Sequence, residues 1–172
     1  NFLTRSLPND PALEYLDVGC GAGHFVAAGI SRKINIKGVD VSEAMIRFGN
    51  DQINHLYSRE PLTFVSEQKF IDVFQTGYDV VSAIGVIEHL RNPRDFFDAF
   101  QRSDARFLYF SVPMYSSSVV FENVFPDIFP RQLAAGHTHL FTEDSLKKMI
   151  KLLGAVSRAE WRFGTDMMDL FR

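Results

Sequence analysis

Short runs of apolar, largely β-branched and aromatic residues recur along the chain and alternate with segments that have a helical pattern. The apolar runs fall at residues 13–18, 34–39, 62–65, 78–84 and 107–112. Because these runs are continuous rather than alternating, they predict strands of a sheet that is covered on both faces. Strands separated by helices are typical of βαβ units. We therefore expect an α/β fold: a three-layer α/β/α, Rossmann-like, doubly wound sheet that is mostly parallel.

Three predicted helices have recognisable starts, at Ser42, at Asn92 (followed by Pro93) and at Thr142. Apolar positions after each start mark the face expected to be buried. They are Met45, Gly49, Ile53 and Leu56 in the first helix, Phe96, Phe97 and Phe100 in the second, and Leu146, Met149, Ile150 and Leu153 in the third. This spacing of three and four residues predicts amphipathic helices that pack on the sheet.

The length of 172 residues suits a single domain covering residues 1–172. One segment, residues 115–138, lacks strand patterning and is too long for a bare connection, so we expect a lid or a substrate-binding insertion there. If that segment is helical, Phe121, Phe125 and Phe129 form an aromatic stripe. The chain opens on Asn1 instead of methionine, and we expect it to be a fragment of a longer protein.

Composition narrows the possible partners. Hydrophobic residues make up 46% and charged residues 23%, a globular balance that excludes general disorder. The net charge of −3 argues against nucleic acid as a partner, because such binding rests on neutralising phosphates. No apolar run approaches the ~18 residues of a membrane helix. A single cysteine, Cys20, cannot form an internal disulfide, which favours a cytoplasmic location.

A glycine-rich loop, with Asp17, Gly19, Gly21 and Gly23, follows the first predicted strand and opens a helix. Doubly wound sheets bind cofactors at this place, and glycines let a ligand approach the backbone closely. A dinucleotide fingerprint needs a glycine where His24 stands. The carboxylate of Asp17 would also repel a pyrophosphate, whereas it suits a ligand with an ammonium group. The loop therefore favours an amino-acid tail over phosphates.

A second acidic residue, Asp40, ends the second predicted strand about 20 residues after the loop. An acid at this distance hydrogen-bonds the ribose hydroxyls of an adenosine-bearing cofactor. The alternative is that Asp40 caps the following helix, but Ser42 is already placed to do so.

With these motifs the chain resembles the class I S-adenosylmethionine-dependent methyltransferases, and most closely the small-molecule branch of type 11 and type 23 domains. The matching blocks are D-x-G-x-G-x-G at 17–23, Asp40, Tyr-Asp-Val-Val at 78–81 running into 86–90, and the block 136–142. The resemblance covers roughly residues 11–155. It implies in-line transfer of a methyl group from S-adenosyl-L-methionine to an O, N or C atom of a small-molecule acceptor, leaving S-adenosyl-L-homocysteine.

The same resemblance implies which residues hold the cofactor. The glycine loop would surround the methionyl part and Asp40 the ribose. Glu67, with Gln68 beside it, is the best counterpart of the family's acid near adenine, although the family's common Asp-Ala pair is missing. The full expected set is Asp17, Gly19, Cys20, Gly21, Gly23, Asp40, Val41, Glu67, Gln68, Ile84 and Gly85.

The catalytic residues are harder to identify, because the cofactor supplies the reactivity in this chemistry. His89, after the fourth strand, and His137 are the candidate general bases. Each could instead hold a loop in place. His139 lies two residues on from His137 and could face the same way.

We expect no metal site. Some quinone-pathway relatives bind a divalent metal through an E-x-x-E-H cluster, but here Gly85 stands at its first position. No cysteine or nearby carboxylate completes a ligand spacing around His137 and His139. Two alternative functions remain open, an NAD-dependent oxidoreductase and a cofactor-binding module without catalytic activity.

Overall fold

The computed structural model describes residues 10–73, 77–115, 117–125, 127 and 136–162 of the 172-residue chain. The chain forms two compact units. The first unit comprises residues 1–87 and 92–111, and the second comprises residues 88–91 and 112–172.

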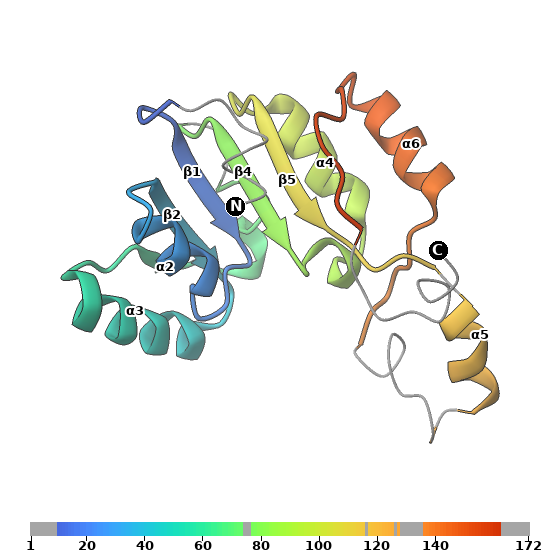
Figure 1. Ribbon diagram of the computed structural model, residues 1–172, viewed down its shortest axis with the longest axis horizontal. Helices are drawn as coiled ribbons and strands as arrows, with labels where there is room; N and C mark the ends of the chain where they lie inside the picture. The colour runs from blue at the N-terminus through green and yellow to red at the C-terminus, as the bar shows by residue number, and fades with distance from the viewer. Residues whose placement is uncertain (1–9, 74–76, 116, 126, 128–135, 163–172) are drawn as a thin grey trace. The chain divides into compact units, whose positions relative to one another are not determined.

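The first unit is built on a five-stranded parallel sheet (Figure 1). Its strands are β1 (Glu14–Val18), β2 (Asn35–Asp40), β3 (Leu62–Phe64), β4 (Val80–Ile84) and β5 (Phe107–Ser111). They lie in the order β3-β2-β1-β4-β5, and every neighbouring pair is parallel. The five strands predicted from the apolar runs are confirmed, with bounds that differ by at most two residues.

Helices cover both faces of this sheet. On one face, α2 (His24–Ile30) and α3 (Glu43–Tyr57) share a core with β2 and β3 that contains Val26, Ile30, Ile36, Ile46, Ile53 and Leu62. Phe25 of α2 stacks on Tyr109 of β5, with ring centroids 6.2 Å apart. The next residue of β5, Phe110, points to the opposite face and meets Phe97 of α4 (Pro93–Arg102) edge to face. The three-layer prediction is confirmed.

The buried face of α3 differs from the sequence prediction. Met45 is 50% exposed and Leu56 is 67% exposed, so both predictions were wrong. The buried positions are Ile46, Gly49 and Ile53. Gly49 sets this rotation, because a Cβ there would lie only 2.5 Å from the carbonyl oxygen of Ala22, and no larger residue fits so close to the glycine loop.

The predicted helix starts are confirmed by their caps. The side chain of Ser42 accepts from the N–H of Met45, and that of Asn92 accepts from the N–H of Arg94. Pro93 occupies the first turn of α4, where its missing N–H costs no hydrogen bond.

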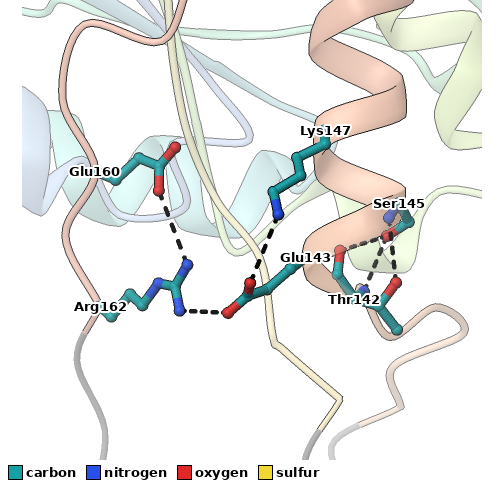
Figure 2. Close-up of polar contacts among 6 residues, drawn as sticks. All are labelled: Thr142, Glu143, Ser145, Lys147, Glu160 and Arg162. Carbon is teal, nitrogen blue, oxygen red and sulfur yellow. Dashed lines mark hydrogen bonds and ion pairs between the residues drawn. The ribbon is translucent and has the colours of Figure 1, made fainter.

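The second unit contains α5 (Ser117–Val124) and α6 (Glu143–Leu152). Figure 2 shows how α6 begins: Thr142 and Ser145 exchange side-chain-to-backbone hydrogen bonds of 3.1 and 2.9 Å, a reciprocal capping box. Glu143 in the first turn pairs with Lys147 and with Arg162. These contacts tie the segment after α6 to the start of the helix. The predicted apolar face of α6 is half-buried.

The predicted insertion at residues 115–138 contains α5, and the side chains in and just after this helix differ in their exposure to solvent. Val119 and Glu122 are buried, while the apolar side chains of Val120, Phe121, Val124 and Phe125 are exposed. Phe129 lies outside the described residues, and the role of the segment as a lid stays a prediction. None of the helices in the described part of the chain has both the length and the apolar character needed to span a bilayer.

The buried aromatic residues of α4 should carry much of the stability of the first unit. Phe96 is completely buried, so Phe96→Ala should lower the free energy of unfolding by about 3–5 kcal/mol. The matched control is Phe48→Ala, because Phe48 is 57% exposed and its loss should change stability by less than about 0.5 kcal/mol. Urea unfolding followed by circular dichroism measures both. Equal losses would contradict the placement of Phe96 in the core.

Candidate functional site

The parallel strands place the sequence motifs at one edge of the sheet. The glycine loop follows Val18 at the end of β1, and Asp40 ends the neighbouring strand β2. β1 also pairs with β4, although the two are not consecutive in the chain. Ligands of doubly wound sheets bind at such a point, outside the carboxyl ends of the strands.

Asp40 links the two motifs directly. Its Oδ2 accepts a hydrogen bond of 2.8 Å from the N–H of Gly21, and its Oδ1 accepts one of 2.7 Å from the N–H of Ser42. A carboxylate has about four lone-pair sites, so both oxygens can accept further bonds from ribose hydroxyls. The N–H groups of Gly19 and Cys20 also donate to the carbonyl of Val39. The loop is thus held against the end of β2.

The three loop glycines all have positive φ, but the space around their Cβ positions differs. A Cβ at Gly19 would clash with the side chain of Val86, and one at Gly23 would lie 2.7 Å from Cδ1 of Leu62. A Cβ at Gly21 would meet nothing within 4 Å. Gly21 therefore faces open space, which is where a bound ligand can approach the backbone.

Asp17 is almost completely buried, and its Oδ1 accepts a 2.6 Å hydrogen bond from the hydroxyl of Ser82 on β4. Burial raises the pKa of Asp17 to about 7, opposed by the hydrogen bond from Ser82 and reinforced by the charge of Asp40. Such an acid is poised to become charged when a cation arrives. A ligand ammonium group would supply that cation.

Ser82 and Tyr109 complete a cross-strand row with Asp17 that sequence reasoning missed. Asp17 pairs with Ser82, and Ser82 pairs with Tyr109, so their side chains lie on one face of the sheet. Burial raises the pKa of Tyr109, and the charge of Asp17 raises it further. The available signal was Ser82 itself, a polar residue within an otherwise apolar strand.

The other expected cofactor residues in the first unit lie at or just beyond the same strand ends. Val41 and Ile84 are partly exposed apolar side chains, at 41% and 38%. The N–H of Gly85 donates to the hydroxyl of Ser111. Burial, together with the charges of Asp17 and Asp40, raises the pKa of the Cys20 thiol far above its usual range, which keeps the thiol protonated and neutral.

The segment proposed to reach adenine follows β3. The N–H of Val65 donates to the carbonyl of Asp40, which ties this segment to the end of β2. Glu67 and Gln68 come next, in a short 3₁₀ helix (η1, Glu67–Lys69), and both are exposed. Their contact with adenine stays a prediction.

The two candidate bases, His89 and His137, come together in the second unit. The carbonyl of Glu88 accepts from the N–H and hydroxyl of Thr138 and from the N–H of His139. These hydrogen bonds hold the two segments together, and the ring centroids of His89 and His137 lie 5.0 Å from each other. His139 instead places its Nδ1 2.9 Å from the hydroxyl of Thr138, so it does not join the pair.

Glu88 is a further member of this group, which the sequence analysis considered only as the fourth position of an incomplete E-x-x-E-H cluster. It is 4% exposed, and one ligand atom each from Glu88, His89 and His137 lie within 4.8 Å of one another. Local sequence patterns do not bring Glu88 and His137 together, because the two residues come from separate segments.

The pKa of Asp17 makes cofactor binding depend on pH. Below pH 7 the acid is mostly protonated, and a bound ammonium group favours its charged form, so binding should release a proton. Affinity for S-adenosylhomocysteine should rise roughly tenfold from pH 6 to pH 8 and be nearly flat in Asp17→Asn. Calorimetry in buffers of different ionisation enthalpy measures the proton release. A flat profile in the unaltered chain would contradict this account.

The same shift acts on the ligand-free chain. Because the pKa of Asp17 in the folded chain lies above its ordinary value of 3.8, the stability contributed by Asp17 is fully present below pH 3.8 and is lost as pH rises through 7.

The open space at Gly21 predicts a steric effect on ligand binding. Gly21→Val should lower affinity for S-adenosylhomocysteine at least tenfold, because the new side chain would occupy the space that the ligand needs. Gly154→Val is the matched control. Gly154 has a similar φ, +61° against +54°, and an equally open Cβ position, so it carries the same backbone strain at the end of α6. Titration calorimetry compares them, and equal affinities would remove the loop from the binding site.

Comparison with known proteins agrees with the geometry. A family described as "Methyltransferase domain" matches residues 1–156. A probable fatty acid methyltransferase, Rv3720 of Mycobacterium tuberculosis, is 32% identical over 89 residues, which make up 52% of this chain and 21% of that protein. The chain thus spans about a fifth of the length of this curated relative.

Two solved structures share the fold. Magnesium protoporphyrin IX methyltransferase from Synechocystis PCC 6803, with bound S-adenosylhomocysteine, has a TM-score of 0.68 at 19% identity, over 87% of this chain and 68% of that one. The small RNA methyltransferase HEN1 has a TM-score of 0.67 at 17% identity, over 89% of this chain and 20% of that one. The match to the family model over most of its length shows that the chain belongs to the S-adenosylmethionine-dependent methyltransferase-domain family.

Proposed function

We propose that the chain transfers a methyl group from S-adenosylmethionine to an O, N or C atom of a small-molecule acceptor. The observation that carries this proposal is the hydrogen bond from the N–H of Gly21 to Asp40. It joins the glycine loop to Asp40, the acid proposed to bind the ribose, at the edge formed by the carboxyl ends of the strands. Gly21 is also the loop glycine whose Cβ position is open.

Each part of the first-unit site matches a part of the cofactor. Buried Asp17 would pair with the ammonium group of the methionyl tail, and Asp40 would accept from the ribose hydroxyls. Val41 and Ile84 offer apolar surface for the less polar portions of the ligand. Holding the methyl donor in line with an acceptor contributes about 7–11 kcal/mol to such reactions, so positioning is the main task of these residues.

The reaction itself moves one carbon. An electron pair of the acceptor (a lone pair on O or N, or a π or carbanion pair on C) attacks the methyl carbon. The carbon–sulfur bond breaks and its electron pair stays on sulfur, which leaves the thioether S-adenosylhomocysteine. An acceptor hydroxyl or ammonium group also has to lose a proton. His89 and His137 are the groups proposed to accept that proton as general bases. Their ring centroids lie 5.0 Å apart, so both rings could reach the same acceptor group.

Two observations favour a small-molecule acceptor over a nucleic acid. The net charge of −3 gives little general attraction for phosphates. The exposed Val120, Phe121, Val124 and Phe125 of the segment containing α5 offer apolar surface that suits a hydrophobic acceptor. The named acceptors of the relatives range from a fatty acid and a porphyrin to small RNA, so the acceptor class needs a direct test.

Methyl-labelled cofactor provides that test. The chain should transfer label to at least one member of a panel of fatty acids and carboxylated macrocycles, and not to a small RNA. Transfer to RNA alone would overturn the small-molecule assignment. Binding of S-adenosylhomocysteine without transfer to any acceptor would favour the module without catalytic activity, and tighter binding of NADH would favour the oxidoreductase.

The ribose role of Asp40 gives a sharper prediction. Asp40→Ala should weaken S-adenosylhomocysteine binding about 10- to 100-fold, because hydrogen bonds to a charged group are worth about 1.5–3 kcal/mol. Asp51→Ala, at an exposed position of α3, is the matched control and should bind like the unaltered chain. Adenine, which lacks the ribose, should bind both variants equally. Unchanged affinity of Asp40→Ala for the full cofactor would contradict the ribose assignment.

A further inference from the structure

A buried serine lies directly beside the buried acid of the first unit. Ser82 on β4 pairs in register with Asp17 on β1, and the two residues are only 2% and 3% exposed. The hydroxyl of Ser82 donates to Oδ1 of Asp17 over 2.6 Å. Side chains enclosed to this degree depend on protein partners for their hydrogen bonds. The charge of Asp17 is therefore closely coupled to the hydroxyl of Ser82.

The hydroxyl of Ser82 has a second acceptor within reach. Its Oγ lies 3.4 Å from the carbonyl oxygen of Leu16, the residue before Asp17 on the same strand. A hydroxyl has one proton to donate and two lone pairs with which to accept. It can therefore give a well-aligned hydrogen bond to only one of these two acceptors at a time, and the charge of Asp17 decides which one receives it.

Each charge state of Asp17 has its own arrangement of these bonds. An ionised carboxylate only accepts, so Ser82 donates to it, and the distance of 2.6 Å is typical of a hydroxyl that donates to a charged oxygen. A protonated Asp17 can instead donate its proton to Oγ of Ser82, whose hydroxyl then turns to the carbonyl of Leu16. Ser82 thus has a partner in both states, and Asp17 can gain or lose a proton without leaving it unpaired.

The titratable groups that interact with Asp17 come from three other elements. They are Asp40 at the end of β2, Cys20 in the glycine loop and Tyr109 on β5. Asp40 opposes ionisation of Asp17, and the other two groups have raised pKa values that keep them neutral. Among the described residues, the contact that lowers the pKa of Asp17 is the hydrogen bond from Ser82. Burial still raises that pKa to about 7, so both charge states are accessible near neutral pH.

We propose that Ser82 is a positioning residue for cofactor binding, whose hydroxyl holds the carboxylate of Asp17 in the charged form that pairs with the ammonium group of the methionyl tail. Ser82 acts through Asp17, and its role rests on the proposed pairing of Asp17 with that group. A protonated Asp17 releases its proton to the solvent when the cofactor binds. The hydrogen bond from Ser82 makes that release easier.

Two variants of nearly the same shape test this role. Ser82→Thr keeps the hydroxyl and Ser82→Val replaces it with a methyl group, so the cost of a larger side chain is common to both. Hydrogen bonds to a charged group are roughly twice as strong as neutral ones, so loss of the hydroxyl should disfavour the ionised acid. Ser82→Val should bind S-adenosylhomocysteine about 5- to 10-fold more weakly than Ser82→Thr at pH 6, where Asp17 must first lose a proton. At pH 9 the acid is already ionised in both variants, and titration calorimetry should give nearly equal affinities.

A purely structural role of Ser82 would give a different pattern. If Ser82 only packs the sheet, the ratio of the two dissociation constants stays the same at every pH, and this result would overturn the proposal. Methylthioadenosine, which keeps the nucleoside and the thioether but lacks the ammonium group, should bind both variants equally. Thr63→Val, at an exposed position of β3, is the matched control for loss of a strand hydroxyl and should bind like the unaltered chain at both pH values.

A measurement without ligand separates this proposal from the cofactor assignment. Carbon-13 NMR titration of the Asp17 carboxyl group should give a higher pKa in Ser82→Val than in Ser82→Thr, and equal pKa values would refute the role of Ser82 while leaving the cofactor assignment intact. If the pKa values differ but Asp17→Asn binds S-adenosylhomocysteine as tightly as the unaltered chain, the pairing with the ammonium group is wrong, and the role of Ser82 in cofactor binding is wrong with it. Circular dichroism checks the folding of each variant. If Ser82→Val does not fold, Ser82→Ala against the unaltered chain provides the same comparison.

Discussion

The arrangement of the first unit depends most on the two hydrogen bonds that the carboxylate of Asp40 accepts. One oxygen accepts from Gly21 in the glycine loop and the other from Ser42 at the start of α3. Three separate pieces of chain, the loop after β1, the end of β2 and the next helix, are thereby fixed around one charged group. Hydrogen bonds to an ionised acceptor are stronger than neutral ones, so a single side chain can organise this edge.

The two acids at this edge of the sheet lie in different surroundings. Asp17 is enclosed between β1 and β4 and receives one strong hydrogen bond, from Ser82, so desolvation dominates and raises its pKa. Asp40 is only partly buried and accepts from two backbone N–H groups. The same residue type is therefore a buried acid with a raised pKa at one position and a partly exposed acceptor of backbone hydrogen bonds at the other.

The two compact units contain different groups of polar residues. The first holds the parallel sheet and the predicted cofactor residues, whereas the second holds the cluster of Glu88, His89 and His137. The chain passes from one to the other directly after Ile87, which is completely buried.

The sequence by itself determined the strands, the capped helix starts and the loop motif, because all of these depend on residues close together in the chain. Continuous apolar runs give buried parallel strands, and Ser42, Asn92 and Thr142 satisfy helix N–H groups within three residues. The tertiary structure alone decided the rest. The rotation of α3 follows from the approach of Gly49 to Ala22, the partnership of Asp17 with Ser82 follows from strand register, and the meeting of Glu88 with His137 follows from a clamp between distant segments. Local patterns could not reveal these contacts, because each joins residues that are far apart in the chain.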